Sequence, residues 1–333
     1  MWEKIRRNTT GKTRLAIIGY GYMGHVYHQA FRELKVERQS EHYYKINLDD
    51  LLSGIDLVAV VDPVFKESDR TQLEQEGVRG FKDLETLFAS RLDIDAAVIA
   101  SPIATHFDLA RACLERGISL LIEKPVCPTR NRIAQLARIA RSKGLVILPA
   151  HVERYNPVCI DAREYVDYKI MGAVQRYTLR RCSAKPDRVR ESLIVDKLIH
   201  DVDLAHALFG PFRVKTVDVQ RKNDEIMQVQ VSTAHRRGYT GTILSSWLIE
   251  EKERSIQIEF ERGRLMGDLL QKKMKVYRLR EFSKEITGYR NNQIKDQLLD
   301  FLAFLKYPTR PLVNIKDALW AAKIIDRVVE LAT

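Results

Sequence analysis

The chain has 333 residues, enough for two domains, and its 55 basic and 44 acidic side chains give a formal net charge of +11. A hydrophobic content of 45% and a charged content of 30% exclude a largely disordered protein. No stretch approaches the roughly 20 apolar residues of a membrane span, and no apolar segment follows the basic N-terminus, so we expect neither membrane insertion nor secretion. The positive charge is compatible with nucleic-acid binding, with anionic small-molecule ligands, or with a merely solvated surface.

Four cysteines lie far apart in the chain and form no Cys-x-x-Cys pair: Cys113, Cys127, Cys159 and Cys182. This spacing predicts reduced thiols in a cytoplasmic protein, and neither a disulfide framework nor a zinc site.

The first half of the chain alternates short apolar runs with helical patterns. We expect buried strands at residues 14–19, 57–61, 96–100, 119–122 and 145–148. Helices are expected at residues 22–34, 83–90, 107–116 and 130–142, the last with Thr129 as N-cap and Gly144 as C-cap. The alternation predicts an α/β domain at residues 1–150, with the doubly wound parallel sheet of a Rossmann fold.

Longer, alternating strands dominate the second half. They are expected at residues 174–180, 213–219, 226–234, 240–247, 255–261 and 275–280, with helices at 193–208, 293–305 and 315–331. We therefore draw a boundary near Ala150 and predict that residues 151–333 form an α+β domain with a mainly antiparallel sheet; the family resemblance described below implies that this sheet is large and open and that the domain serves substrate binding and oligomerisation.

A glycine-rich turn follows the first predicted strand and opens the first predicted helix. Gly19, Gly21 and Gly24 form the pattern G-x-G-x-x-G, with Tyr22 and Met23 between the last two. The first glycine permits the tight turn, the second lets the backbone approach a pyrophosphate, and the third lets the helix pack closely on the strand. The exposed N–H groups of the helix start then face the phosphates. We predict a dinucleotide site here; the alternative is a purely structural turn.

Asp62 ends the second predicted strand, where a carboxylate accepts hydrogen bonds from the ribose hydroxyls of NAD. A 2′-phosphate would be repelled there and no arginine follows directly, so NAD is favoured over NADP. Asp62 lies 38 residues after Gly24, whereas the usual spacing is about 20. We interpret residues 35–55, including the run 41–44, as an insertion that bears on the cofactor preference but not on the fold.

Several further motifs occur in a characteristic order. Ser101-Pro102 and His106 precede Glu123-Lys124-Pro125, and the run 196–203 follows with Asp196 and His200. Together they resemble the glucose–fructose oxidoreductase, inositol dehydrogenase and rhizopine-catabolism (Gfo/Idh/MocA) family over nearly the whole chain. The resemblance implies a Rossmann domain, a second domain with an open sheet, and nicotinamide-dependent oxidation of a sugar or cyclitol hydroxyl. It also implies cofactor contacts from Ser101, Pro102, His106, Glu123 and Lys124.

Residues 151–157 and 185–190 look like the branch of this family that acts on nucleotide sugars. The likeness is closest to UDP-N-acetylglucosamine 3-dehydrogenases, which make a 3-keto sugar for a partner aminotransferase in lipid A assembly. By the same resemblance we expect a homodimer or homotetramer.

Lys124 can also be interpreted without the family. It follows a predicted parallel strand, where doubly wound sheets place their ligands, and Pro125 restricts its backbone to an extended form. An ammonium beside a reacting hydroxyl stabilises the alkoxide that builds up as hydride leaves. The alternative is a surface lysine before a loop.

Asp196 and His200 are four residues apart, so they share one face of the predicted helix. A histidine with a pKa near neutrality is a natural base for a hydroxyl proton, and a neighbouring carboxylate can orient it. By resemblance this pair and Lys124 are the catalytic set; the alternative is a solvated Asp–His pair. We exclude a metal site at residues 200–203, because adjacent side chains diverge on a helix and nicotinamide chemistry needs no metal.

Substrate contacts are expected from Arg154 and Asn156, which follow the last Rossmann strand; by resemblance Asn156 holds sugar hydroxyls. A basic cluster leads into the catalytic helix: Arg180, Arg181, Lys185, Arg188 and Arg190. One or two of these residues, foremost Arg188 and Arg190, should contact a substrate diphosphate, unless the loop is only solvated. His206 and His235 are interpreted as structural or surface histidines.

The sequence therefore predicts NAD-dependent oxidation of a sugar hydroxyl, foremost the 3-hydroxyl of UDP-N-acetylglucosamine. One alternative is another sugar, cyclitol or UDP-hexuronate dehydrogenase of the same family. A second is a non-catalytic dinucleotide-binding regulatory protein. Nucleic-acid binding has no recognisable motif behind it.

Overall fold

The computed structural model describes residues 11–37, 47–187, 189–278, 281–307 and 309–333. The chain divides into two compact units, Met1–Val152 with Asn291–Leu319, and Glu153–Arg290 with Trp320–Thr333. The first unit ends close to the boundary expected near Ala150, but residues 291–319, which were expected in the second domain, belong to the first unit. They return because the apolar side chains of one late helix complete the core of that unit.

The first unit contains a six-stranded parallel sheet in the order β3-β2-β1-β4-β5-β6. Its strands are β1 (Thr13–Ile18), β2 (Ile55–Val61), β3 (Arg79–Phe81), β4 (Ala96–Ile99), β5 (Ser119–Ile122) and β6 (Ile147–Pro149). Its helices are α1 (Tyr22–Glu37), α2 (Leu48–Ser53), α3 (Glu67–Gln75), α4 (Leu84–Ala89), α5 (Ile103–Glu115), α6 (Arg130–Lys143) and α9 (Gln293–Lys306). This strand order is that of the Rossmann fold, so the predicted fold class is confirmed.

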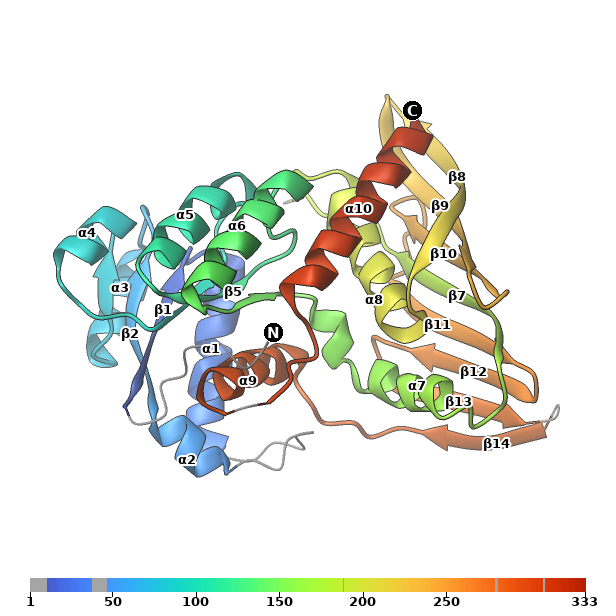
Figure 1. The fold of residues 1–333 in the computed structure, drawn as a ribbon, viewed down its shortest axis with the longest axis horizontal. Helices are drawn as coiled ribbons and strands as arrows, with labels where there is room; N and C mark the ends of the chain where they lie inside the picture. The colour runs from blue at the N-terminus through green and yellow to red at the C-terminus, as the bar shows by residue number, and fades with distance from the viewer. Residues whose placement is uncertain (1–10, 38–46, 188, 279–280, 308) are drawn as a thin grey trace. The chain divides into compact units, whose positions relative to one another are not determined.

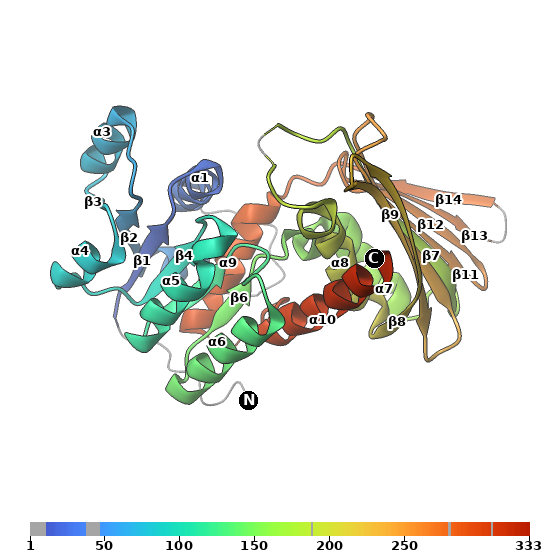
Figure 2. The same ribbon diagram turned by 90° about the horizontal axis from the view of Figure 1, so that it is seen from above.

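The core of this unit lies between the sheet and the pair α1 and α9, while α5 and α6 lie on the other face (Figures 1 and 2). Thr129 caps the start of α6 by accepting a hydrogen bond from the backbone N–H of Arg132, and Gly144 ends α6 in the left-handed conformation, as predicted. Neither β3 nor α3 was expected from the sequence, because both are short and polar and their apolar residues show no clear helical or strand periodicity. Within the proposed insertion the structure describes α2; the run 41–44 lies outside the described residues.

The second unit is built on an eight-stranded sheet in the order β14-β13-β12-β11-β7-β10-β9-β8. Its strands are β7 (Val174–Cys182), β8 (Phe212–Lys222), β9 (Glu225–His235), β10 (Thr240–Ser246), β11 (Glu253–Phe260), β12 (Gly263–Asp268), β13 (Lys273–Arg278) and β14 (Glu281–Ile286). All pairs are antiparallel except β7 with β10, whose carboxyl ends therefore lie at one edge of the sheet. The predicted mainly antiparallel sheet is confirmed.

Helices cover one face of this sheet. They are α7 (Pro157–Asp167), α8 (Ile199–Phe209) and the second half of α10 (Ile315–Ala332), and they share one apolar core with the sheet (Figure 2). The other face carries no helix among the described residues (Figure 1). Two strands, β12 and β14, were not expected from the sequence. Glycines interrupt the alternating pattern of β12, and charged residues dominate β14.

The four cysteines are buried and free in the described structure. No helix in the described ranges has the length and apolarity required to cross a bilayer.

Candidate active site

The glycine turn has the geometry that a pyrophosphate cradle requires. Gly19 has a positive φ of 91°, and a Cβ atom there would lie 2.5 Å from the backbone nitrogen of Ser101. A Cβ on Gly24 would lie 2.2 Å from the carbonyl oxygen of Gly19, so only glycine permits the close approach of α1 to β1. Nothing lies within 4 Å of a Cβ built on Gly21, so this backbone faces open space at the start of the helix. The residues present fit a bound dinucleotide phosphate.

Asp62 follows β2 and is tied directly to this turn. One of its carboxylate oxygens accepts a hydrogen bond of 2.6 Å from the backbone N–H of Tyr20, and the other accepts one of 2.8 Å from Val64. The carboxylate thus lies beside the glycine turn despite the long sequence separation, as a ribose-binding group must. Of the fingerprint's variable residues, Tyr22 is exposed and Met23 packs against the core of the first unit.

Lys124 follows β5 and lies next to a buried carboxylate. Glu123 accepts hydrogen bonds from the hydroxyl of Tyr27 at 2.8 Å and from the backbone N–H of Lys124 at 3.1 Å. Burial raises the pKa of Glu123. Glu123 therefore fixes the backbone of Lys124, and no described contact shows it facing a ligand.

A glutamine from α9 extends this network. Gln297 is fully buried, its side-chain oxygen lies 3.1 Å from the Tyr27 hydroxyl, and its amide nitrogen has no partner. The single hydroxyl proton of Tyr27 is given to Glu123, so turning the amide over lets its nitrogen donate to Tyr27 and satisfies both groups. The hydrogen-bonded path from Gln297 through Tyr27 to Glu123 thus links α9 to the residue that precedes Lys124.

His106 connects the two loops that carry the family motifs. Its ring nitrogens lie 2.7 Å from the carbonyl oxygen of Ser101 and 3.0 Å from that of Pro125, and the side chain is 1% exposed. Burial lowers the pKa of His106. His106 therefore supports these two loops through backbone carbonyls, and the cofactor contact expected of it stays a prediction. Ser101 and Pro102 form the loop that His106 holds, and the Ser101 hydroxyl bonds to Thr105 at 2.7 Å.

Asp196 and His200 lie in the second unit, at a break in helical geometry. We expected one regular helix over residues 193–208; instead a π-helical turn (Ile194–Leu198) precedes α8. The wider turn is marked by the bond from the N–H of Ile199 to the carbonyl of Ile194, five residues back. Such turns are frequent at functional sites, because they displace side chains from regular helical positions.

Asp201 and Asp203, which follow His200, each form an ion pair with an arginine. Asp203 receives two hydrogen bonds from Arg154, at 2.7 and 2.6 Å, and Asp201 receives three from Arg181, at 2.9 to 3.2 Å. Both carboxylates are buried. Arg154 therefore anchors α8, and the substrate contact expected of it stays a prediction.

Asn156 also has a structural use. Its side-chain oxygen caps α7 by accepting from the backbone N–H of Val158 at 3.1 Å, and its amide nitrogen donates to the carbonyl of Leu269 at 3.0 Å. The residue is fully buried. Asn156 therefore caps a helix in this structure, and its expected contact with sugar hydroxyls stays a prediction.

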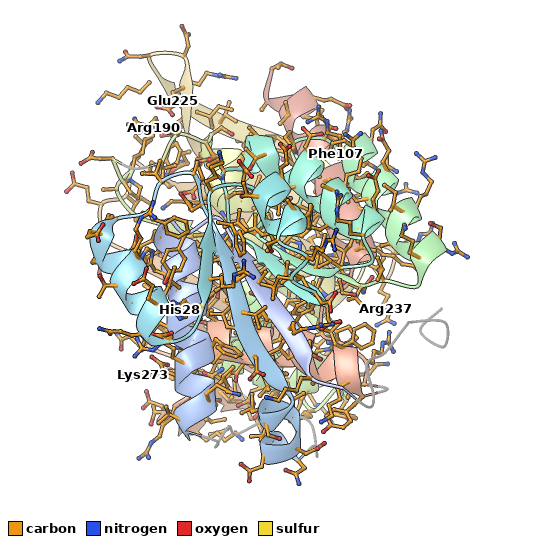
Figure 3. The ribbon with its side chains drawn as sticks, turned by 90° about the vertical axis from the view of Figure 1, so that its left-hand side faces the viewer. His28, Phe107, Arg190, Glu225, Arg237 and Lys273 are labelled. Carbon is orange, nitrogen blue, oxygen red and sulfur yellow. The ribbon has the colours of Figure 1, made fainter. Side chains whose placement is uncertain are left out.

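The basic cluster of residues 180–190 is largely neutralised within the protein. Arg180 pairs with Glu253 at 2.9 Å, and Lys185 pairs with Glu225 at 2.6 Å. Arg181 is bound by Asp201 and by Glu153. Arg190 is exposed (Figure 3), and Arg188 lies outside the described residues. Arg180, Arg181 and Lys185 each have an acidic partner in the described structure. The diphosphate contact expected from one or two members of the cluster, foremost Arg188 and Arg190, stays a prediction.

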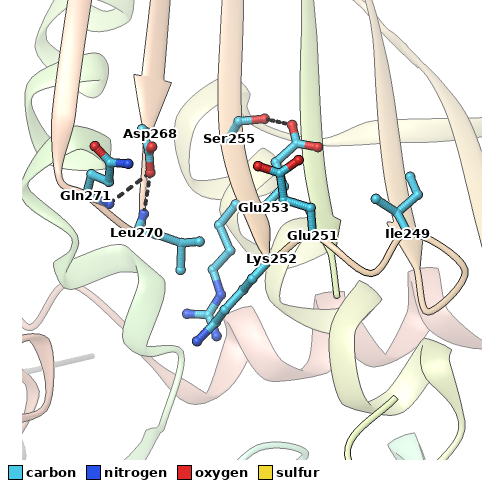
Figure 4. A pocket seen from close by; sticks show the side chains of 9 residues that line it. Ile249, Glu251, Lys252, Glu253, Ser255, Asp268, Leu270 and Gln271 are labelled. Carbon is cyan, nitrogen blue, oxygen red and sulfur yellow. Dashed lines mark hydrogen bonds between the residues drawn. The ribbon is translucent and has the colours of Figure 1, made fainter. Parts of the chain in front are cut away.

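A cavity of about 350 Å³ opens at the edge of the second unit where β11 begins and β12 ends. Figure 4 shows Lys252 beside the start of β11 and the hydrogen bond that joins Glu253 to Ser255. Asp268 is engaged by the backbone N–H groups of Leu270 and Gln271. Since its lining mixes acidic and basic groups, the cavity alone does not define a ligand.

Fold and glycine turn together define a nucleotide-binding α/β protein with a second, open-sheet unit. Residues 13–151 match the model of the Gfo/Idh/MocA oxidoreductase family with an NAD-binding Rossmann fold. The predicted family and cofactor class are thereby confirmed.

Proteins of assigned activity that are similar to this chain are dehydrogenases, in agreement with the family match. A UDP-N-acetylglucosamine 3-dehydrogenase of Acidithiobacillus ferrooxidans is 27% identical over 60% of this chain, and an inositol 2-dehydrogenase of Saccharopolyspora erythraea is 31% identical over 59%. The matched segments span 62% and 54% of those relatives. The solved structure of the Acidithiobacillus enzyme has a TM-score of 0.79 at 21% identity, covering 96% of this chain and 97% of that chain. The likeness of fold therefore extends over both units.

Three residues near these sites were not singled out from the sequence. Tyr27, Gln297 and Lys197 are polar side chains within otherwise apolar helical faces. That pattern signals a buried polar group, but it does not reveal the partner, which comes from a distant segment in each case.

Proposed function

We propose that this protein oxidises a secondary hydroxyl of a nucleotide sugar with NAD, foremost the 3-hydroxyl of UDP-N-acetylglucosamine. The observation that carries the proposal is the glycine turn open at Gly21 beside Asp62, in a chain whose fold follows that of a UDP-N-acetylglucosamine 3-dehydrogenase over both units. NAD, when bound, supplies the hydride acceptor.

The roles of the protein's own residues follow from their chemistry. His200, oriented by Asp196, takes the hydroxyl proton, because a neutral imidazole is a base near neutral pH. Lys124 stabilises the alkoxide that forms on the sugar. Glu123, held by Tyr27, fixes the backbone at Lys124. The glycine turn and Asp62 hold the phosphates and a ribose of the cofactor.

The test is NADH formation, followed by absorbance, with a panel of UDP-N-acetylglucosamine, its uronate and myo-inositol. We expect the highest kcat/KM with UDP-N-acetylglucosamine. Preference for the uronate or for myo-inositol would assign the protein to another branch of the same family. Cofactor binding without turnover on any member of the panel would contradict the proposal and favour a regulatory protein.

Three further expectations belong to this proposal. A cytoplasmic location, a homodimer or homotetramer, and a downstream aminotransferase that consumes the 3-keto product follow from the same resemblance. A mass-based measurement of the oligomer in solution tests the second.

A further inference from the structure

Lys197 is a buried cation without an acidic partner. It lies on the π-helical turn next to Asp196 and is 7% exposed. Its ammonium donates to the hydroxyl of Ser183 at 2.5 Å and weakly to the carbonyl of Ser246 at 3.4 Å. Within the described residues, no carboxylate oxygen lies within 4.0 Å of it. A buried charge held only by neutral groups is costly unless another charge approaches it.

Two further donors without acceptors lie at the same strand ends. Ser245 and Trp247 are 0% and 3% exposed, and neither the hydroxyl oxygen nor the indole nitrogen has a hydrogen-bond partner in the described structure. They flank Ser246, whose carbonyl receives both the Lys197 ammonium and the backbone N–H of Ser183. We call Ser183, Lys197, Ser245 and Trp247 the strand-end cluster.

The parallel pairing of β7 and β10 brings this cluster together. Ser245 pairs in register with Arg181, and Ser246 with Cys182, so both strands end at one edge of the sheet. Arg181 is fully engaged by Asp201 and Glu153. The remaining positive charge at this edge is that of Lys197. The Ser183 hydroxyl accepts from this ammonium and donates to the carbonyl of Ala184, so the groups of the cluster that can still donate are the Lys197 ammonium, the Ser245 hydroxyl and the Trp247 indole N–H.

Neighbouring charges agree with this assignment. The pKa of Lys197 is lowered to about 8, mainly by burial; Asp196 opposes this shift, and Arg181 and Arg254 add to it. Lys185 stands 4.9 Å from the centre of the Trp247 ring, so a second cation borders the cluster. An uncharged ligand would leave the excess charge uncompensated, and a buried water would supply no counter-charge.

We propose that the strand-end cluster binds an oxyanion group of the substrate, with the Lys197 ammonium as its counter-ion. The inference rests on the proposed function for the identity of the ligand: a phosphate of the nucleotide diphosphate or the carboxylate of a uronate sugar. It adds, to the diphosphate contact expected foremost from Arg188 and Arg190, a lysine one position from the Asp196 of the proposed catalytic set.

The experiment measures binding without turnover, by calorimetric titration with UDP and separately with glucuronate. The variants are Lys197→Met, Ser245→Ala and, as the matched control, Lys273→Met, which removes an exposed charge on β13 (Figure 3). We expect Lys197→Met to weaken one of the two ligands about 10- to 100-fold, because a hydrogen bond to a charged group is lost. Lys273→Met should bind both ligands like the unmodified protein.

The two ligands distinguish the source of the oxyanion. A loss for UDP alone assigns the cluster to the diphosphate, and a loss for glucuronate alone assigns it to a sugar carboxylate. Ser245→Ala removes a hydroxyl that has no partner, so the fold should be unaffected while affinity falls about three- to tenfold. This variant decides the question if Lys197→Met does not fold.

The inference is overturned if the unmodified protein binds neither ligand, or if both variants bind like the control. Its failure is distinguishable from failure of the proposed function. NADH formation from UDP-N-acetylglucosamine, together with unchanged affinities of Lys197→Met for both UDP and glucuronate, removes the inference alone. Lys197-dependent binding of UDP without NADH formation from any nucleotide sugar removes the proposed function alone.

Discussion

At the scale of single residues, hydrogen bonds from neighbouring groups fix the backbone of Lys124, in addition to its position directly after a strand. The strand β5 ends at Ile122, Glu123 accepts the backbone N–H of Lys124, and Tyr27 holds Glu123 from α1. The direction of the lysine backbone is therefore fixed from the protein interior, a precondition for an ammonium that must meet a developing alkoxide.

Replacing this lysine tests its catalytic role. Lys124→Ala should lower kcat by several hundredfold, because one preorganised charge contribution to the transition state is removed. NAD affinity should stay within about threefold, since the glycine turn and Asp62 are untouched. Steady-state NADH formation and a cofactor titration measure the two quantities. Lys12→Ala, which removes an exposed lysine paired with Asp56, is the control; near-normal turnover in Lys124→Ala would sink the assignment.

A second residue, Lys197, has a stability cost that depends on pH. Its pKa of about 8 in the folded protein lies below the ordinary lysine value, so the unfolded chain binds more protons between these two values. The cost of burying the ammonium is thus fully present below pH 8 and disappears as the pH rises toward about 10.4. Lys197→Met should raise the thermal midpoint at pH 7 and change it less at pH 9.5. An equal midpoint for both proteins at pH 7 would contradict this.

At the scale of elements, helix α8 is anchored by charges as well as by apolar packing. Arg181 on β7 joins Asp201 of α8 to Glu153, and Arg254 on β11 also donates to Glu153 at 3.0 Å. These side chains come from four separate segments. The network thus fixes where α8 begins relative to the sheet and where Asp196 and His200 are presented.

Breaking the network should be costly. Arg181→Met leaves two buried carboxylates without their main partner, and we expect a loss of about 3–5 kcal/mol in the free energy of unfolding. Arg163→Met is the matched control, because its pair with Asp167 is exposed along one helix and should contribute less than about 0.5 kcal/mol. Chemical denaturation of both variants measures the difference. Equal losses in the two variants would show that the network is not an anchor.

The elements also show what local sequence can and cannot predict. Thr129 and Gly144 delimit α6 as expected, since caps act within one turn of the backbone. The π-helical turn at Ile194–Leu198 was not predictable, because nothing local distinguishes its residues from a regular helix. The basic run at residues 180–190 suggested an anion site, but its acidic partners come from β9, β11 and α8, far away in sequence.

At the scale of the whole molecule, buried histidines make stability depend on acid. Burial lowers the pKa of His28 and of His106, and it lowers the pKa of His235 to about 4. The histidine pKa in the unfolded chain is about 6.5, so these folded-state values are lower. The stability that the neutral, buried histidines contribute is therefore fully present above pH 6.5 and is lost as the pH falls from 6.5 toward the folded-state pKa values.

We therefore predict that the protein loses stability at pH values well above the pKa of ordinary carboxylates. Between pH 7.5 and pH 4.5 the free energy of unfolding should fall, with His235 alone contributing up to about 3 kcal/mol. His235→Gln should flatten the profile, whereas Lys273→Met should leave its slope unchanged. Urea unfolding at several pH values measures this. A profile for the unmodified protein that is flat down to pH 4.5 would contradict the prediction.

The sequence alone determined the Rossmann order of strands and helices, the glycine turn, the positions of Asp62 and Lys124, and the open sheet of the second unit. These features depend on apolar periodicity and on local backbone requirements, both of which are written in neighbouring residues. The tertiary structure decided which polar side chains remain available. It gave Arg154, Arg181 and Asn156 to internal partners, returned residues 291–319 to the first unit, and left Lys197 without a counter-charge. A side chain's availability depends on what distant segments bring to it, and that information does not exist until the chain has folded.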